Sequence, residues 1–224
     1  MASKRKKLLI WGAGGHAKVV ADLVDVLGSH EIVAFFDDVA NPGRGRKLLA
    51  VRVVTEREEF KRLISGTPTE VIVAIGNCEA RTGLANEARV MGLQLAPALV
   101  HPRATVASGV TLGAGSVVLA GAVVNTGTTI GENVIVNTSS SVDHDCVLKD
   151  GVHICPGAHL AGDVTVDRGA WVGIGATVIE KVRIGERALI AAGAVVVRDV
   201  PAGAVAKGCP GKISRGKKAP RRYV

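Results

Sequence analysis

The sequence predicts a small parallel α/β domain in the N-terminal half, followed by a parallel β-helix. Residues 100–196 follow a six-residue hydrophobic period, whereas residues 1–96 alternate short apolar runs with helical segments. The composition is also poor in aromatic residues: only six of 224 residues are Phe, Trp or Tyr, while 28 are Gly. Small and β-branched side chains suit a narrow β architecture better than a helical bundle.

The repeat places an aliphatic residue at every sixth position from Val100 to Val196 without interruption. A small residue or a valine follows four places after each of them, and Gly or Asn often stands between. This pattern is typical of a solenoid with flat faces, whose aliphatic and small residues point inward while Gly or Asn turns the corners. Three hexads then make one coil, so that residues three hexads apart stack at the usual strand spacing of about 4.8 Å.

The first 96 residues predict strands that alternate with helices, which implies a small parallel sheet. Strands are expected at 8–11, 31–36 and 71–75, and helices at 16–27, from a capping box at Thr55 and Glu58 to about Ile64, and up to Met91, where Gly92 ends the last one. Pro97 and Pro102 bracket the expected boundary. We therefore expect domains at 1–97 and 98–212 and a basic tail at 213–224.

A glycine-rich loop after the first strand predicts a nucleotide site in a Rossmann-like domain. Gly12, Gly14, Gly15 and His16 fit the pattern G-x-G-x-x-G/A, in which glycines let the backbone approach a phosphate at a helix N-terminus. Asp37 and Asp38 follow the second strand, and Gly76 and Asn77 follow the third. These groups would share one sheet edge. The domain is small, which favours a nucleotide-sugar over a redox dinucleotide, and the same residues could also form only turns and caps.

Chemically active residues in the repeat half are concentrated between residues 136 and 163. His144 stands at a corner between Asp143 and Asp145, as suits a general base, although a solvated corner would have the same composition. His153, His159 and Cys155 point outward, and Asn137 lies one coil from Cys155. Cys146 occupies an inward position typical of core packing. A thiol nucleophile at Cys155 is a weaker hypothesis than a histidine base.

The segments GAGGHAKVV, FFDD, AIGN, VNTSSSVDHDC and HICPGAHLAG, taken together and in this order, resemble the NeuD/PglD family. Members of that family are bacterial sugar O- or N-acetyltransferases. The resemblance covers residues 8–212. It implies a left-handed β-helix, a homotrimer and acetyl-CoA between adjacent β-helices. The expected acceptor is a nucleotide-linked deoxy sugar, which takes the acetyl group on its amino group, expected at the 4-position. Acetyl-CoA would be a co-substrate, and no metal is expected.

The same resemblance implies roles for individual residues. His144 would be the general base, oriented by Asp145, where one branch of the family has the longer Glu. Gly162 would donate its backbone N–H to the thioester carbonyl. The acetyl and acceptor site would further include Asn137, Asp143, His153 and Cys155. On the nucleotide side, Gly12, Gly14, Gly15 and His16 would meet the phosphates, with Asp37, Asp38, Gly76 and Asn77 around the base or ribose.

Three alternatives stay open from the sequence. The acceptor could be a hydroxyl of a sialic-acid-type sugar instead of an amine. The outward histidines also prompt comparison with zinc-dependent γ-type carbonic anhydrases, but His153 and His159 are separated by a full hexad, which places them on different faces. A regular solenoid can also be a non-enzymatic, nucleotide-sensing scaffold.

The basic character of the chain, with a net charge of +8, belongs to its two ends. Eleven of the 28 bases lie in residues 1–7 and 207–224, where there is no acid, and residues 8–206 carry a net charge of −3. A nucleic-acid groove is therefore not expected, although the C-terminal bases could meet the phosphates of CoA. No apolar run is long enough to span a membrane, no signal peptide is recognisable, and the four cysteines lack a metal spacing. We expect a cytoplasmic protein without membrane insertion.

Overall fold

The computed structural model describes residues 5–38, 47–65 and 69–214. Its first part is an α/β domain with a six-stranded sheet in the order β3-β4-β2-β1-β5-β6. The strands are β1 (Lys6–Trp11), β2 (His30–Phe36), β3 (Lys47–Leu48), β4 (Val51–Val54), β5 (Thr69–Val73) and β6 (Gln94–Leu95), and the helices are α1 (Gly15–Leu27), α2 (Arg57–Ile64) and α3 (Cys78–Val90). All pairs are parallel except β3 with β4. The predicted parallel α/β domain is confirmed.

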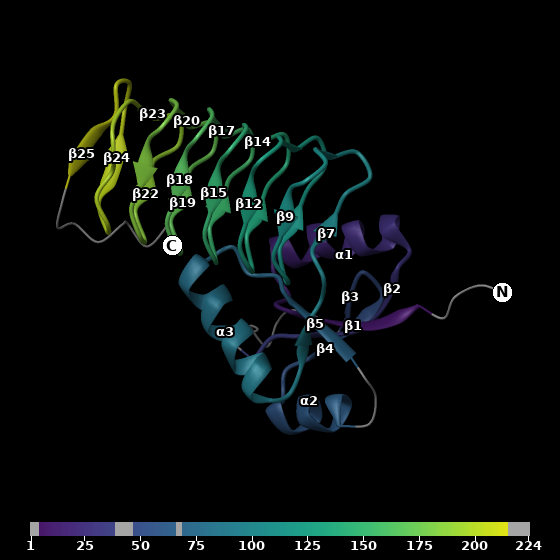
Figure 1. Cartoon of the computed structure of the whole chain (residues 1–224). Helices are drawn as coiled ribbons and strands as arrows, with labels where there is room; N and C mark the ends of the chain where they lie inside the picture. The colour runs from purple at the N-terminus through teal and green to yellow at the C-terminus, as the bar shows by residue number, and fades with distance from the viewer. Residues whose placement is uncertain (1–4, 39–46, 66–68, 215–224) are drawn as a thin grey trace.

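The second part is a parallel β-helix of two-residue strands on three faces (Figure 1). The first face contains β7 (Leu99–Val100), β10 (Val117–Val118), β13 (Ile135–Val136), β16 (His153–Ile154), β19 (Trp171–Val172) and β22 (Leu189–Ile190), extended by β24 (Val205–Lys207) and β25 (Lys212–Ser214). The second contains β8 (Thr105–Val106), β11 (Val123–Val124), β14 (Ser141–Val142), β17 (His159–Leu160), β20 (Thr177–Val178) and β23 (Val195–Val196). The third contains β9 (Thr111–Leu112), β12 (Thr129–Ile130), β15 (Val147–Leu148), β18 (Thr165–Val166) and β21 (Arg183–Ile184).

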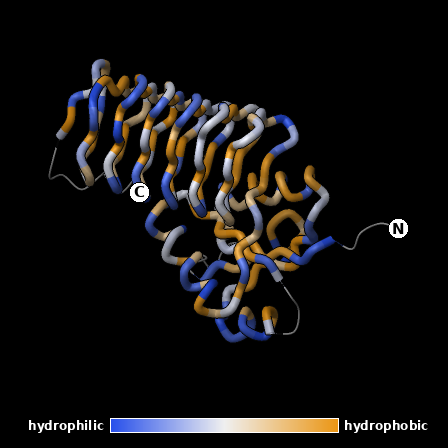
Figure 2. The backbone as a smooth tube through the Cα atoms, viewed as in Figure 1, coloured by the Kyte–Doolittle hydropathy of each residue, from blue (hydrophilic) through white to orange (hydrophobic). Residues whose placement is uncertain are grey.

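The interior of the β-helix is the one that the hexad pattern predicts. Val118 pairs with Val100 on one side and Val136 on the other, so aliphatic residues three hexads apart stack directly. The small residues four places later, such as Ala122 and Ala158, are fully buried beside them. Figure 2 shows the hydrophobic residues recurring in each successive coil. Val and Ala fill this narrow interior, which leaves no room for aromatic rings.

The last coil is shorter than the others. Leu189 pairs with Val205 and Ile184 with Val200, a spacing of 16 residues where the earlier coils have 18. The chain then turns back, and β25 pairs with β24 in antiparallel orientation. This strand continues to Ser214, past the expected end of the β-helix domain at residue 212. The rest of the predicted tail, from 215 to 224, lies outside the described residues, as do residues 1–4.

Two local predictions in the α/β domain need correction. Helix α2 is not capped by Thr55, because its N-cap is Glu56, which makes no side-chain capping bond. Asp or Glu in the first turn still suits the helix dipole, and Glu58 supplies such a charge. The short strands β3, β4 and β6 were not predicted, since two to four residues give too little periodicity. Gly92 does follow α3 with a φ of 79°, as expected for a residue that ends a helix.

The two parts are joined by a continuous apolar contact. Val20 and Leu23 of α1 belong to the same buried cluster as Leu99, Val117 and Ile135, which lie on the first face of the β-helix. Figure 1 shows α1 beside β7 and α3 on the same side of the coils. The loops at the carboxyl ends of β1 and β5 are therefore held against the first face of the β-helix. Within the described residues, no helix is long and apolar enough to cross a membrane.

Candidate active site

His144 stands at an exposed corner directly after β14. The corner turns through Asp145, whose φ of 58° lies in the left-handed region that Asp and Asn tolerate better than most residues. The backbone N–H of Asp145 donates to the carbonyl of Thr126 in the preceding coil. This turn carries the Asp145 carboxylate back to the ring, where Oδ2 lies 2.8 Å from Nδ1 of His144. The side chain of Asp145 is therefore long enough to contact the His144 ring, although it is shorter than a Glu side chain.

The carboxylates at this corner favour the protonated form of the imidazole. The hydrogen bond to Asp145 raises the pKa of His144, and the charges of Asp143, Asp145 and Asp163 add to the effect. When Nδ1–H donates to Asp145, Nε2 carries the lone pair and is available to accept a proton. The ring is also exposed, with 57% of the side-chain surface accessible. This arrangement suits a general base whose ring is held in a fixed orientation.

Gly162 lies directly beneath the His144 ring. A Cβ atom at this position would come within 2.6 Å of Nε2 and 2.5 Å of Cε1, so only glycine allows the ring to rest on this backbone. Residue 162 lies one coil further along the chain than residue 144, and the N–H of Asp163 donates to the carbonyl of His144 at 2.9 Å. The stacking of the coils thus places the backbone of Gly162 next to Nε2 of His144, the nitrogen that would accept a proton.

Asp143 has a structural contact on each side. Its Oδ1 accepts from Nδ2 of Asn125 at 2.7 Å and from the backbone N–H of His144 at 2.8 Å. These hydrogen bonds, with the amide of Asn125 first, lower the pKa of Asp143. The carboxylate therefore fixes the backbone of the corner and contributes negative charge near the imidazole.

His153 lies in a second cluster, where the α/β domain covers the first face of the β-helix. Its side chain is almost fully buried. Nε2 lies 3.1 Å from Nδ2 of Asn137, and Nδ1 lies 3.1 Å from Nε1 of Trp171 and 3.3 Å from the carbonyl oxygen of Gly76. The ring of His16, from the glycine-rich loop, is 6.5 Å away between centroids. Burial and the charge of Arg81 lower the pKa of His153 to about 3 and that of His16 to about 4.

The two buried thiols are not placed for nucleophilic attack. Cys155 points out of the β-helix as predicted, but the α/β domain covers it, so that it is only 2% exposed. Burial raises the pKa of its thiol, which opposes thiolate formation. Both observations disfavour Cys155 as a nucleophile, and its neighbourhood is that of a packed thiol. Cys146 is fully buried in the β-helix core, and its Sγ lies 3.2 Å from the carbonyl of Ala161.

The glycine-rich loop has the geometry that its sequence predicts. Gly12 has a φ of 120°, and a Cβ atom there would lie 2.8 Å from the carbonyl oxygen of Ala74, so glycine is required. Gly14 is the N-cap of α1 and makes no side-chain capping bond. Around Gly14 and Gly15 the space that a Cβ would occupy is open. The space beside Gly14 and Gly15 is thus open next to the N-terminus of α1, where an anion is favoured.

The polar residues after β2 and β5 make contacts within the protein. Asp37 accepts from the N–H of Ala13 at 3.0 Å and so braces the glycine-rich loop. Asp38 pairs with Arg57, whose Nε lies 2.8 Å from Oδ2. Asn77 is the N-cap of α3 and accepts from the N–H of Ala80 at 2.7 Å. Of these three residues, only Asn77 is a cap, whereas Asp37 and Asp38 contact segments that are distant in the sequence.

Arg81, which no sequence pattern singles out, is 1% exposed and connects the two domains. Its Nε donates to the carbonyl of Asn133, Nη2 to that of Gly151, and Nη1 to those of Ile75 and Gly76, all at 2.8–3.0 Å. A guanidinium has five N–H donors, which suits it to collect carbonyl groups. On sequence alone, Arg81 is one of several charges on a predicted helix. Trp171 was also missed, because an aromatic residue on an outer face gives no signal of its own.

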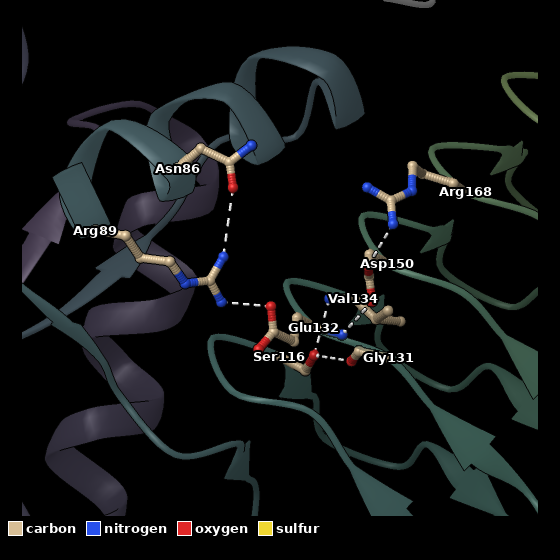
Figure 3. Close-up of polar contacts among 8 residues, drawn as sticks. All are labelled: Asn86, Arg89, Ser116, Gly131, Glu132, Val134, Asp150 and Arg168. Carbon is tan, nitrogen blue, oxygen red and sulfur yellow. Dashed lines mark hydrogen bonds and ion pairs between the residues drawn. The ribbon is translucent and has the colours of Figure 1, made fainter.

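A second, more exposed connection lies on the same side of α3. Figure 3 shows Arg89 directed at Glu132 of the β-helix, with Asn86 on the same helix. In the next coil, Asp150 accepts from the N–H of Glu132 at 3.0 Å and from Arg168 at 2.9 Å. In the preceding coil, Oγ of Ser116 donates to the carbonyl of Gly131 and accepts from the backbone N–H of Val134. The corner that receives Arg89 is thus well braced.

The structure gathers the predicted site residues into two groups. The first lies at the corner after β14, where His144 and Asp145 are exposed, Asp143 is half-buried and Gly162 is buried. The second lies at the domain junction, where buried His153 is surrounded by half-buried His16, Gly76 and Asn137. Within the ranges that the structure describes, no group of three or more His, Cys, Asp or Glu residues is arranged to hold a metal ion.

Known proteins are similar to this chain in both of its domains. Residues 7–88 match the PglD N-terminal domain family. The UDP-N-acetylbacillosamine N-acetyltransferase of Bacillus subtilis is 35% identical over 115 residues, which are 51% of this chain and 52% of that protein. The match thus spans about half the length of this curated relative.

Two solved structures match nearly the whole chain. One is the acetyltransferase domain of PglB from Neisseria gonorrhoeae with acetyl coenzyme A, at 38% identity and a TM-score of 0.85, covering 93% of this chain and 99% of that one. The other is a mutant of GDP-perosamine N-acetyl transferase from Caulobacter crescentus with CoA and GDP-perosamine. It has 38% identity and a TM-score of 0.87, covering 94% of this chain and 97% of that one.

Proposed function

Since the chain belongs to the family of PglD-like sugar N-acetyltransferases, we propose that it transfers the acetyl group of acetyl-CoA to the amino group of a nucleotide-linked sugar. The observation that carries this proposal is the His144 corner, where Asp145 orients the imidazole and Gly162 lies beneath it. The names of the relatives support the substrate class: one is solved with acetyl coenzyme A and another with CoA and GDP-perosamine.

The proposed reaction is a direct transfer in a ternary complex. Nε2 of His144 accepts a proton from the sugar amine as the amine nitrogen attacks the thioester carbon. The carbonyl electrons move onto oxygen, which the N–H of Gly162 stabilises as an oxyanion-hole donor. Collapse of the tetrahedral intermediate breaks the carbon–sulfur bond and releases CoA thiolate. His144 then returns its proton to the thiolate or to water, so no acyl-enzyme is needed.

The nucleotide part of the acceptor is proposed to bind at the α/β domain. The open space beside Gly14 and Gly15, at the positive end of α1, suits the phosphates. His16, Gly76, Asn137 and His153 would line the path between this site and the β-helix. Because Asp37, Asp38 and Asn77 are engaged by protein groups, we propose that they shape the site by positioning its loops.

We further propose that the enzyme works as a homotrimer in the cytoplasm, where acetyl-CoA is available. The exposed position of His144 supports a site completed by a neighbouring copy, and the β-helix exposes Val147, Ile174, Ile179 and Val197. Exposed apolar side chains mark an interaction surface where they form a contiguous patch.

The experiment that tests the function is a coupled measurement of thiol release. Purified protein is incubated with acetyl-CoA and a panel of 4-amino nucleotide-sugars carrying UDP, GDP or dTDP, with mass spectrometry of the product. We expect thiol release with at least one amino sugar and a product heavier by one acetyl group. The matched control is the same sugar with a hydroxyl in place of the amine, and free sialic acid tests O-acetylation. Release only with hydroxyl acceptors would contradict N-acetyl transfer.

A further inference from the structure

Arg81 is a buried cation whose contacts lie on both sides of the domain junction. Its side chain is 1% exposed, and burial lowers the pKa of its guanidinium. Among the described residues, the groups that its nitrogens contact include no carboxylate; they are the Cys78 thiol and the backbone carbonyls of Ile75, Gly76, Asn133, Gly151 and Val152. A buried charge without an opposite charge costs folding free energy, and an apolar side chain could fill the same space without this cost. Packing alone therefore does not explain an arginine here.

The guanidinium holds one loop of the α/β domain against two coils of the β-helix. Nη1 donates to the carbonyls of Ile75 and Gly76, in the loop after β5, at 2.8 and 3.0 Å. Nε donates to Asn133 and Nη2 to Gly151, both at 2.8 Å, and these two residues stand one coil apart. Because the guanidinium is planar and its donors have fixed directions, the hydrogen bonds of Arg81 fix where this loop lies relative to the coils.

The other large contact between the domains is apolar and lacks this directionality. Helix α1 packs against Leu99 and Val117 of the first face. Hydrophobic burial is non-directional, and packed helices can slide by small amounts, so this contact holds the domains together without fixing their angle. The ion pair of Arg89 with Glu132 is exposed and contributes little. Arg81 is thus the directional contact in the buried part of the junction.

The loop that Arg81 holds also reaches the predicted acceptor site. The carbonyl oxygen of Gly76 lies 3.3 Å from Nδ1 of His153, and Nε2 of the same ring lies 3.1 Å from Nδ2 of Asn137. On the basis of the proposed function, one acceptor molecule has its phosphates at the start of α1 and its amine at His144. It must reach both places at once, so the placement of one domain on the other decides whether the amine lies within attacking distance.

We propose that Arg81 is a positioning residue for the acceptor: it fixes the loop after β5 on the β-helix and so sets the distance between the nucleotide site and His144. This inference rests on the proposed function. Arg81 is buried and acts through the carbonyls that it holds, without touching the substrate. Its replacement should impair the reaction of a bound nucleotide-sugar, which spans both domains. Binding of a nucleoside diphosphate alone, which needs only the α/β domain, should not change.

Cysteine labelling tests the attachment of the loop without depending on activity. Cys155 is 2% exposed because the α/β domain covers it, whereas Cys146 is buried inside the β-helix. Both proteins are treated with iodoacetamide to low total labelling, and each cysteine is followed by peptide mass spectrometry. In Arg81→Met, Cys155 should react about tenfold faster, as expected when the loop opens more easily by the equivalent of one hydrogen bond. Loss of the Arg81 charge by itself would slow the reaction, because that charge lowers the pKa of the Cys155 thiol.

Cys146 is the internal control for global unfolding, and it should remain protected in Arg81→Met. Arg89→Met is the matched variant on the same helix and should label as the wild type does. If Arg81→Met does not fold, Arg81→Lys serves as the second variant: a single ammonium cannot hold carbonyls on both sides, so Cys155 should again react faster. An unchanged rate at Cys155 in the variant that folds, or equal increases at Cys155 and Cys146, would overturn the proposal.

Kinetics and calorimetry test the consequence for the substrate. With an amino nucleotide-sugar that the wild type acetylates, Arg81→Met should raise the KM for that sugar and lower kcat, each by about tenfold. The KM for acetyl-CoA and the Kd of the matching nucleoside diphosphate should stay as in the wild type, and Arg89→Met should change none of these values. An unchanged sugar KM and kcat, or an equal loss of affinity for the nucleoside diphosphate, would overturn the role in positioning. Failure of every panel sugar would contradict the proposed function and leave the labelling to decide whether Arg81 holds the loop.

Discussion

At the scale of single residues, the proposed reaction depends on His144, whose side chain contributes little to the packing of the fold. His144 is exposed, and its ring contacts Asp145 and the backbone at Gly162 without entering either core. Removing such a side chain should therefore affect chemistry far more than stability. This separation is what allows its role to be tested by substitution.

Replacing His144 by Ala should lower the rate of acetyl transfer by about 10²-fold or more, because the amine then lacks a general base. The free energy of unfolding should change little. The measurement is kcat from thiol release, together with a urea unfolding curve. His159→Ala is the matched control, since His159 is another exposed imidazole of the β-helix, and it should retain near wild-type activity. Full activity of His144→Ala would remove this residue from the mechanism.

The pH dependence should report the contact between His144 and Asp145. Asp145 raises the pKa of His144, so the ring stays protonated, and unable to accept a proton, up to a higher pH. Activity should rise as pH increases through this pKa. In Asp145→Asn the hydrogen bond to a charged acceptor is lost, so the rise in kcat/KM should move to lower pH. Asp163→Asn, which removes only a more distant charge, should shift the profile less. An unchanged acidic limb in Asp145→Asn would contradict the assignment.

Gly162 should be intolerant of even one added carbon. A Cβ atom would overlap Cε1 and Nε2 of His144, so Gly162→Ala must displace the ring from the backbone. We expect kcat to fall by about 10-fold to 100-fold with little loss of stability. Gly83→Ala is the control, because Gly83 lies in helix α3 with open space at its Cβ position and should accept Ala with normal activity. Normal activity of Gly162→Ala would show that the ring position is not critical.

At the scale of secondary structure elements, α3 connects the α/β domain to the β-helix. Arg81, in its first turn, ties the loop after β5 to carbonyls of two β-helix coils, and Arg89, in its last turn, reaches Glu132 (Figure 3). The first contact is buried and the second is exposed. The two arginines therefore provide a comparison of the same residue type on one helix.

Arg81→Met should lower the free energy of unfolding by about 3 kcal/mol, because several buried carbonyls lose their donor at once. Arg89→Met should cost less than about 1 kcal/mol, as is usual for an exposed ion pair. Urea denaturation measures both values, and Arg81→Lys tests whether a charge without the planar guanidinium suffices. Equal effects of the two Met substitutions would contradict a special role for Arg81.

An element can be predicted from the sequence when a local or repeated residue pattern determines it. The hexads predict every rung from Val100 to Val196, because each coil repeats the same contacts with its neighbours. The shortened last coil breaks this rule, and no repeat reports it in advance. The position of His144 between two acids was evident in the sequence. The contacts of Arg81 and Trp171 were not evident in the sequence, because each of them joins residues that are far apart in the chain.

At the scale of the whole molecule, the proposed homotrimer is the property to test. The folded body is mildly acidic and the net positive charge comes from the ends. Among the described residues, the β-helix exposes the large apolar side chains of Val147, Ile174, Ile179 and Val197. An interface between copies of the chain would cover side chains of this kind.

Sedimentation equilibrium or light scattering of the purified protein should give the mass of three chains, about three times 23.0 kDa. Substituting Lys for Ile174 should shift the protein toward single chains if this residue lies in the interface, whereas Lys at Val90, which is 88% exposed on α3, should not. A wild-type protein that sediments as one chain at micromolar concentration would contradict the homotrimer.

The hairpin of β24 and β25 has a consequence for assembly along the axis of the β-helix. A stack of identical rungs ends in unpaired backbone groups, which are a template for the rungs of another molecule and hence for fibril growth. Here the returning chain occupies them: Val195 exchanges backbone hydrogen bonds with Gly208 and Gly211, and β25 runs antiparallel to its neighbour. At the other end, α1 packs beside the first rungs, against Leu99 and Val117 of the first face. Among the described residues, the last strand of the solenoid therefore runs in the reversed direction, which makes it a poor template for a further parallel rung.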